Sequence, residues 1–133
     1  MTPNQVAAWN LRRLRTQAGM TQGRLAELMS HFGIPWTVFT VSDAELAVRR
    51  GDRGRSFTLD ELALLALVFY VTPAGLLTPP SPADTGTAQP VTMAVGDIEM
   101  SRETYLIDVL LHPSGVGARR IDGALHEESA RMS

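Results

Sequence analysis

The 133-residue sequence contains no cysteine and no lysine. Without cysteine the chain has no disulfide bond, no thiolate metal ligand and no catalytic thiol. No apolar run approaches the roughly 18 residues that a membrane span needs, and no basic segment precedes an apolar stretch at the N-terminus. We therefore expect neither a transmembrane protein nor a secreted precursor, and we expect a cytoplasmic location.

Residues that carry catalysis or hold metal ions are sparse. The three histidines, His31, His112 and His126, are scattered, and none has the spacing to another histidine that a zinc site needs. The glycine-rich turn at 114–117 lacks the flanking strand and helix of a phosphate-binding loop. We therefore expect no enzyme, no metal and no cofactor.

The charge is unevenly distributed along the chain. Residues 1–77 contain eight arginines and six acidic side chains, whereas residues 78–133 contain four arginines and eight acidic side chains. The net charge of -2 is not typical of a nucleic-acid binder. The distribution nevertheless indicates a mildly basic N-terminal unit joined to an acidic C-terminal one, and arginine makes bidentate phosphate contacts that lysine cannot.

The N-terminal unit is predicted to be all-α. Apolar periodicity and helix-start residues, among them Thr21 and Thr72, place five short helices at about 4–18, 22–30, 36–48, 59–70 and 73–77. The arginines at 12, 13 and 15 fall mostly off the apolar stripe of the first helix and are interpreted as a solvated face. Thr58 and Glu61 have the spacing of a capping box. The helix that follows them is apolar almost all round, so we expect it to be the buried centre of the domain.

The C-terminal part is predicted to be small. Residues 79–90 hold four of the eight prolines and are interpreted as an extended, mobile linker. Alternating apolar residues at 91, 93 and 95 predict one short strand, and Ser101 is predicted to cap a helix over 102–112. The region 91–133 is too short to build a strong core alone. We expect it to pack on the first domain or on a second copy, through the apolar face of Leu106, Val109 and Leu110.

An ordered series of short motifs runs through the first unit: NLRRLR (10–15), GMTQ (19–22), LAEL (25–28), GI (33–34), TVS (40–42), TLDEL (58–62) and VTP (71–73). Over residues 8–78 this series resembles the Cro/repressor-type (XRE-family) helix-turn-helix DNA-binding proteins. The resemblance implies a five-helix, lambda-repressor-like helix-turn-helix domain over residues 1–78. The linker 79–90 and a small α/β or helical appendage over 91–133 follow it.

The resemblance also implies how such a domain contacts double-stranded DNA. The third helix enters the major groove, which is about 12 Å wide in B-DNA. Gln22 stands where the family binds the DNA backbone. The candidates for reading bases lie at the start of the third helix and are Thr37, Val38, Phe39, Thr40, Ser42 and Asp43. The candidates for binding phosphates follow that helix and are Arg49, Arg50, Arg53 and Arg55.

This chain departs from the family pattern at several positions. Val38 and Phe39 stand where polar residues are usual, and two interpretations stay open: contact with thymine methyl groups, or a place in the core or against a partner. Asp43 stands where arginine is common; an acid near phosphates costs affinity, although it can accept a hydrogen bond from a cytosine amino group. Trp36 is interpreted as a core anchor, and Glu45 as a structural tie to backbone or arginine.

Two functions from different classes follow. The first is a transcriptional regulator, a repressor, that binds a short operator as a homodimer, because one such domain buries too little surface for high specificity. The alternative is a protein-interaction module of the same fold, an adaptor or anti-regulator that does not bind DNA specifically. Val38, Phe39, Asp43 and the acidic balance favour this alternative. The region 91–133 is the candidate for dimerisation or for sensing a protein partner or small-molecule effector, and no membrane partner is expected.

Overall fold

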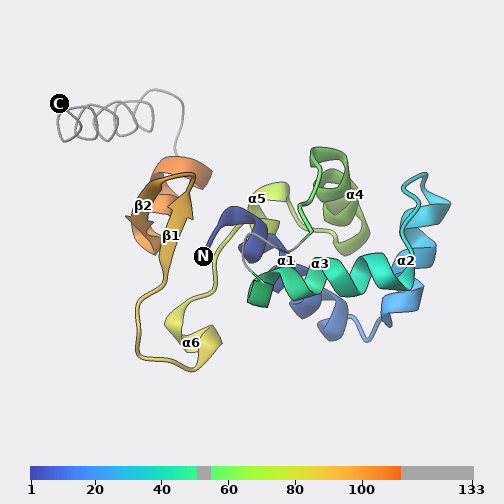
Figure 1. Ribbon diagram of the computed structural model, residues 1–133, viewed down its shortest axis with the longest axis horizontal. Helices are drawn as coiled ribbons and strands as arrows, with labels where there is room; N and C mark the ends of the chain where they lie inside the picture. The colour runs from blue at the N-terminus through green and yellow to red at the C-terminus, as the bar shows by residue number, and fades with distance from the viewer. Residues whose placement is uncertain (51–54, 112–133) are drawn as a thin grey trace. The chain divides into compact units, whose positions relative to one another are not determined.

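The computed structural model describes residues 1–50 and 55–111, apart from the Arg50 side chain. Within these ranges the chain is mostly helical and has one small antiparallel sheet of two strands (Figure 1). The chain divides into two compact units, Met1–Pro79 and Pro80–Ser133. None of the described helices is long and apolar enough to cross a lipid bilayer.

The described part of the first unit contains α1 (Pro3–Gln17), α2 (Gln22–His31), α3 (Val38–Arg50), α4 (Leu59–Phe69) and α5 (Pro73–Leu76). The predicted helix starts are confirmed at Thr21, Thr58 and Thr72, whose hydroxyl groups accept hydrogen bonds from the backbone N–H three residues on. The predicted capping box of Thr58 and Glu61 is present. A second capping box, made by Thr2 and Gln5, starts α1 and was not predicted.

The core of the first unit lies among its helices. α3 packs across α1 and against α2 (Figure 1). Trp36, in the turn before α3, is only 4% exposed, so its interpretation as a core anchor is confirmed. The other buried side chains of this cluster come from all five helices: Leu11, Leu25, Ala26, Met29, Val41, Ala44, Leu65, Ala66 and Leu76.

The expectation that α4 is the buried centre of the domain is wrong. Leu65 and Ala66 are buried, but Leu59 is 83% exposed and Leu67 is 72% exposed. α4 packs against α1, α2 and α5 on one side only. An apolar sequence shows which side chains of a helix can be buried. Only those on a side that packs against neighbouring elements are buried in the fold. The side of α4 without neighbours therefore leaves leucines in water.

The segment predicted to be an extended linker contains a turn of helix, α6 (Pro82–Thr85). Ser81 and Asp84 form a capping box at its start, and Pro82 stands at its first position, where a missing N–H costs nothing. Gly86 ends the turn with a positive φ of 69°. The prediction of an extended linker rested on the proline-rich composition and overlooked the capping box at 81–84, which indicates a helix start.

The predicted single strand is one half of a hairpin. β1 (Thr92–Val95) pairs antiparallel with β2 (Ile98–Ser101), with Val95 opposite Ile98. Gly96 and Asp97 form the two-residue turn, and Gly96 supplies the positive φ of 60° that such turns require. β2 was not predicted: residues 98–100 were assigned to no element, and Ser101 was predicted only as a helix cap.

Ser101 caps the following helix as predicted, accepting a hydrogen bond from the Thr104 N–H. The helix itself differs: α7 (Arg102–Tyr105) continues as a π-helical segment, Leu106–Leu111. α7 packs against both strands. Of the three residues predicted to form the dimer contact, Val109 is 45% exposed, and Leu106 and Leu110 are half-buried. Residue 112, where the predicted helix ends, lies outside the described residues.

Candidate nucleic-acid interface

The start of α3 is fixed by two threonines. The N–H of Thr40 donates to the hydroxyl of Thr37, and the N–H of Thr37 donates to the hydroxyl of Thr40. This reciprocal pair satisfies two backbone donors at the helix start, where intrahelical partners are missing. Thr37 is exposed and Thr40 is half-buried. Two predicted base-reading residues thus also set the position at which α3 begins.

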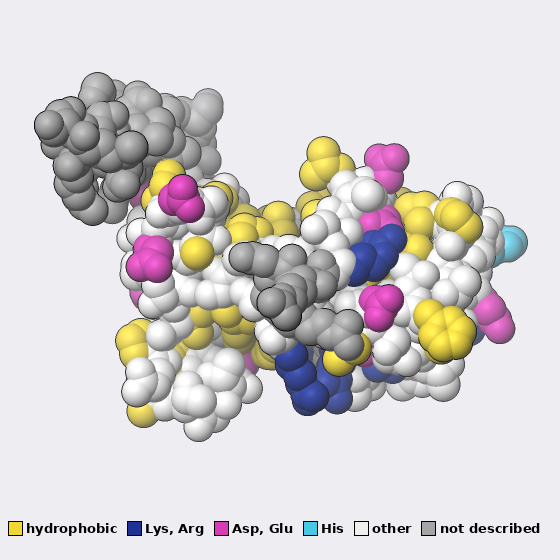
Figure 2. Space-filling view, viewed as in Figure 1, with side chains coloured by type: hydrophobic (Ala, Val, Ile, Leu, Met, Phe, Trp, Pro, Cys, Tyr) yellow, Lys and Arg dark blue, Asp and Glu magenta, His cyan; other side chains and the backbone are white. Residues whose placement is uncertain are grey.

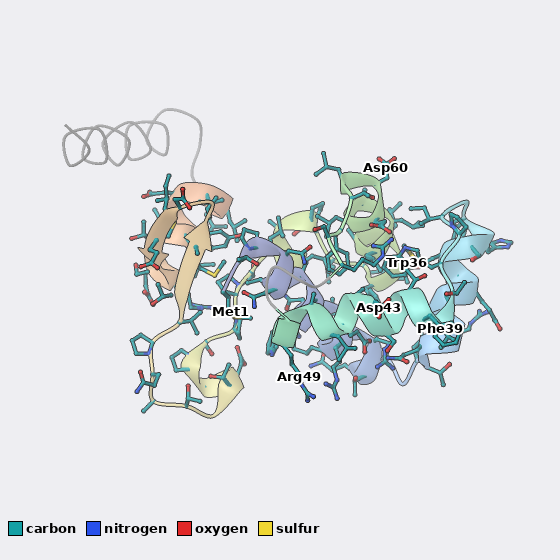
Figure 3. All side chains as sticks on the ribbon, in the orientation of Figure 1. Met1, Trp36, Phe39, Asp43, Arg49 and Asp60 are labelled. Atoms are coloured by element: carbon teal, nitrogen blue, oxygen red, sulfur yellow. The ribbon has the colours of Figure 1, made fainter. Side chains whose placement is uncertain are left out.

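α3 has one exposed face, which we call the outer face. It carries Phe39, which is 78% exposed, Val38, which is 43% exposed, and the exposed side chains of Asp43 and Arg49. Phe39, Asp43 and Arg49 follow one another along α3 in Figure 3. Ser42 is half-buried. The interpretation of Val38 and Phe39 as core residues is therefore wrong, whereas contact with thymine or with a partner stays open.

The opposite face of α3 is packed into the protein. Val41, Ala44 and Ala47 on this inner face are fully buried. Their spacing of three residues keeps them on one side of the helix. The inner face therefore holds α3 rigidly, while the outer face has no neighbour among the described elements that buries it.

Glu45 ties α3 to α1 and α2. Its carboxylate accepts hydrogen bonds from Arg15 Nε at 2.5 Å, Arg15 Nη2 at 3.2 Å and Gln22 Nε2 at 3.0 Å. Arg15 also donates to the Met20 carbonyl at 2.8 Å, in the turn between α1 and α2. The interpretation of Glu45 as a structural residue is confirmed. The interpretation of Arg15 as part of a solvated face is wrong, because its side chain is only 15% exposed.

Gln22, predicted to bind the DNA backbone, is half-buried at the start of α2. Its amide nitrogen is directed at Glu45, so this group positions α2 against α3. The neighbouring arginines of α1 differ from one another. Arg12 is exposed, whereas Arg13 lies over the Trp9 ring at 5.3 Å and donates to the Asn10 side chain.

Glu61 is the centre of a second polar cluster, which sequence reasoning missed. Its carboxylate accepts hydrogen bonds from Trp36 Nε1 at 2.5 Å, from both terminal nitrogens of Arg55 at 3.0 and 2.6 Å, and from the Thr58 N–H at 2.8 Å. Burial alone would raise the pKa of Glu61, but the hydrogen bonds from Arg55, Thr58 and Trp36 outweigh it and lower the pKa from 4.5 to about 2.

The four arginines predicted to bind phosphates do not form one group. Arg49 is exposed at the end of α3. Arg55 is engaged by Glu61, and its guanidinium lies 5.4 Å from the centre of the Trp36 ring, so it positions the turn before α3. The Arg50 side chain and Arg53 lie outside the described residues. Arg49 is thus the member of this set that the described structure presents to solvent.

Two amides of α1 hold the last turn of α3 and the segment that follows it. Asn4 Nδ2 donates to the Arg55 carbonyl at 3.0 Å, and Asn4 Oδ1 accepts from the Phe57 N–H at 2.9 Å. Gln5 Nε2 donates to the Val48 carbonyl in the last turn of α3 at 3.2 Å. In the sequence, Asn4 and Gln5 are simply two polar residues in the first turn of a helix. Nothing in the sequence marks their distant partners, so these contacts were not predicted.

Two further observations bear on function. Among the described residues, no group of His, Asp and Glu side chains is arranged to hold a metal ion. Comparisons of the chain with models of protein families, with curated proteins and with solved structures gave no match.

Proposed function

We propose that residues 1–78 form a lambda-repressor-like helix-turn-helix domain of the Cro/repressor type, and that the protein is a sequence-specific DNA-binding repressor. The observation that carries this proposal is that α3 is fixed on one face and exposed on the other. Its inner face is packed, Glu45 ties it to α1 and α2, and its outer face projects Phe39, Asp43 and Arg49 into solvent. A helix of 13 residues is about 20 Å long and fits the major groove.

The chemistry of the outer face favours particular bases. Phe39 and Val38 offer apolar contact to the C5-methyl group of thymine, and Asp43 can accept from the amino group of cytosine. Neither of the contacts that read purines most often, arginine or lysine to guanine and asparagine or glutamine to adenine, is available from these three residues. We infer a half-site in which thymine and cytosine lie under the first two turns of α3.

Anchoring to the DNA backbone would come from two places. The first turn of α2 carries backbone N–H groups without intrahelical partners, and such a helix start attracts phosphate. Arg49 at the end of α3 supplies a positive charge. Asp43 opposes both, so a single domain is expected to bind weakly. A homodimer on a two-fold symmetric operator would supply the missing affinity.

The test is selection of duplexes from a random pool, followed by fluorescence anisotropy of the selected and scrambled duplexes at about 50 and 200 mM salt. Tight, salt-sensitive binding that prefers a palindrome with thymine and cytosine in each half-site supports the proposal. Weak binding that does not distinguish the duplexes, by a protein with its helical circular dichroism intact, contradicts it.

A protein-interaction module of the same fold is the second candidate. One observation favours it: Phe39 is 78% exposed and has the carboxylate of Asp43 one turn away, where a DNA-facing surface would normally be basic. In that case replacing Arg49 with alanine leaves weak DNA binding unchanged, and Phe39→Ala abolishes capture of the protein partner.

A further inference from the structure

An apolar groove lies between the end of α2 and α4, and none of the outer-face residues of α3 lines it. It is lined by Leu28 and Phe32 on the α2 side and by Leu64, Leu67, Val68 and Tyr70 on the α4 side. Its volume is about 260 Å³. No charged side chain lines it. The hydrophobic surface over α4 and the neighbouring end of α2 is visible in Figure 2.

The rim of the groove is more exposed than its floor. Tyr70 is 97% exposed, Leu67 is 72% exposed and Phe32 is 60% exposed. Leu59, at the other end of α4, is 83% exposed. Leu59 does not line the groove; Tyr70, Leu67 and Phe32 together leave on the order of 400 Å² of apolar surface in water, within the range of the largest patch on a monomer.

Tyr70 adds an independent sign of function, because its backbone is left-handed. Its φ of 55° and ψ of 41° belong to a conformation that favours glycine, and it is the one non-glycine residue with positive φ among the described residues. The conformation ends α4: the Val71 N–H donates to the Ala66 carbonyl, and the Tyr70 N–H donates to the Leu67 carbonyl. Glycine would allow both hydrogen bonds without a steric cost. The residue at this position is instead a tyrosine whose ring is exposed to solvent.

We propose that this groove is the contact between two copies of the chain. The groove is bordered by the exposed side chains of Tyr70, Leu67 and Phe32. Across a two-fold axis, Tyr70 and Leu67 of each copy fill the groove of the other copy. Because the lining is uncharged, no like charges meet when the same residues face each other. It also offers no countercharge to a charged partner.

The exposed rim of the groove is a substantial part of what a second copy needs. A stable interface buries about 800 Å² on each partner, and Tyr70, Leu67 and Phe32 supply about half of it before any polar rim is added. Tyrosine is among the side chains that contribute most at interface centres, because it combines a large apolar ring with a hydroxyl group. A ring held in a strained conformation at the edge of a groove fits this role.

This contact is a different surface from the one expected at Leu106, Val109 and Leu110, which stays a prediction. It rests on the proposed function only where operator symmetry is concerned, because self-association is measured without DNA. The outer-face residues Val38, Phe39, Asp43 and Arg49 are not among the residues that line the groove. A groove-mediated dimer that binds no DNA would uphold this inference and refute the proposed repressor, and a DNA-binding monomer would do the reverse.

The decisive experiment is sedimentation velocity of the full chain from about 1 to 100 μM, a range that brackets weak and moderate association. Leu67→Asp and Tyr70→Gly are expected to raise the dimer dissociation constant at least about thirtyfold, which is the effect of losing an interface hot spot. Leu111→Asp is the matched control: Leu111 is 71% exposed, like Leu67, but lies in the second unit beside Leu110. It is expected to leave the dimer unchanged.

Three results would overturn the inference. The wild-type protein could remain monomeric at the highest concentration. The dimer could survive both Leu67→Asp and Tyr70→Gly. Leu111→Asp could dissociate the dimer while Leu67→Asp does not. Misfolding is not expected to confuse the result, because Tyr70→Gly removes backbone strain and should raise the melting temperature of the monomer while it abolishes the dimer.

Location is tested by spin labelling, which the cysteine-free sequence makes simple. His31→Cys places one label on an exposed position beside Phe32, and Arg12→Cys places one on exposed α1. In a dimer formed through the groove, the two labels at position 31 should lie closer together than the two labels at position 12. The opposite order of distances contradicts the inference.

Discussion

Nε1 of Trp36 donates to Oε2 of Glu61 across 2.5 Å, so the turn that leads into α3 is bound to the first turn of α4. Arg55 reaches the same carboxylate from the segment after α3. The entry to α3 and the chain beyond its end are therefore held by one acidic side chain that is 4% exposed. The direction of α3, and with it the candidate interface, depends on a charge that a change of pH can remove.

Glu61→Gln is expected to destabilise the protein by about 2–3 kcal/mol at pH 7, because Arg55 and Trp36 lose a charged acceptor in a buried place. The lower end applies if the partly exposed Arg55 side chain turns to water. Urea unfolding followed by circular dichroism measures the change. Asp60→Asn, at the exposed neighbouring position labelled in Figure 3, is the control and should cost less than about 0.5 kcal/mol.

The same carboxylate predicts a dependence of stability on pH. The folded-state pKa of Glu61 is about 2, below the ordinary 4.5, so its contribution is complete above pH 4.5 and is lost as the pH falls toward 2. The shift corresponds to about 3 kcal/mol. Unfolding free energies measured from pH 6 to pH 2.5 should converge for wild type and Glu61→Gln. A constant difference over this range would contradict the assignment.

Arg15 and Glu45 are expected to be energetically coupled. A double-mutant cycle with Arg15→Ala and Glu45→Ala should give a coupling free energy of about 1–3 kcal/mol, because both side chains are largely buried. Arg24 and Glu27 form the matched control. They are also paired, at 3.2 Å, but their side chains are 59% and 72% exposed, so their coupling should be at most about 0.5 kcal/mol.

Three of the helix starts could be predicted from the sequence because each depends on residues no more than four positions apart, whereas the third helix, expected to start at residue 36, starts at Val38. Thr21, Thr58 and Thr72 each cap a helix through the N–H three residues on, and threonine before an apolar run is sufficient to indicate that. Trp36 was placed correctly by its apolar size. Local chemistry thus gave most of the element boundaries in the first unit.

The contacts that orient α3 could not be predicted in the same way. Asn4 bonds to Arg55 and Phe57, more than 50 positions along the chain, and nothing in the nearby sequence marks such partners. Arg55 was expected to bind phosphate because it lies in the arginine-rich segment after the third helix. The sequence does not show that its partner is Glu61. Leu67 was expected to be buried because apolar periodicity does not show on which side a helix lacks neighbours.

Base reading by Phe39 is tested by removing the methyl group from thymine. Substituting deoxyuridine for one contacted thymine in the selected operator should weaken binding about fourfold, the free energy of burying one methyl group. Phe39→Ala should weaken binding to the thymine duplex and should no longer distinguish the two duplexes. Anisotropy titrations of both proteins with both duplexes give four dissociation constants, from which the coupling between Phe39 and the thymine methyl group is calculated. Equal sensitivity of wild type and Phe39→Ala to deoxyuridine would place the methyl contact elsewhere.

Arg49 is expected to contact a phosphate rather than a base. Arg49→Ala should weaken binding to selected and scrambled duplexes by similar factors and flatten the slope of log K against log salt by about one unit at most. Arg12→Ala is the matched control, an exposed arginine on α1, and should leave the slope unchanged. A loss confined to the selected duplex would instead assign Arg49 to base recognition.

Tyr70→Gly is expected to stabilise the monomer by about 1 kcal/mol. Glycine adopts the left-handed conformation at the end of α4 without the strain that a side chain carries there, and this gain exceeds its larger entropy loss on folding. Tyr70→Ala keeps the strain and serves as the control, so it should not stabilise. Urea unfolding at a protein concentration where the wild type is monomeric separates this effect from dimer dissociation. If glycine and alanine give the same stability, the backbone of Tyr70 is unstrained, and its exposed ring alone must support a role at the interface.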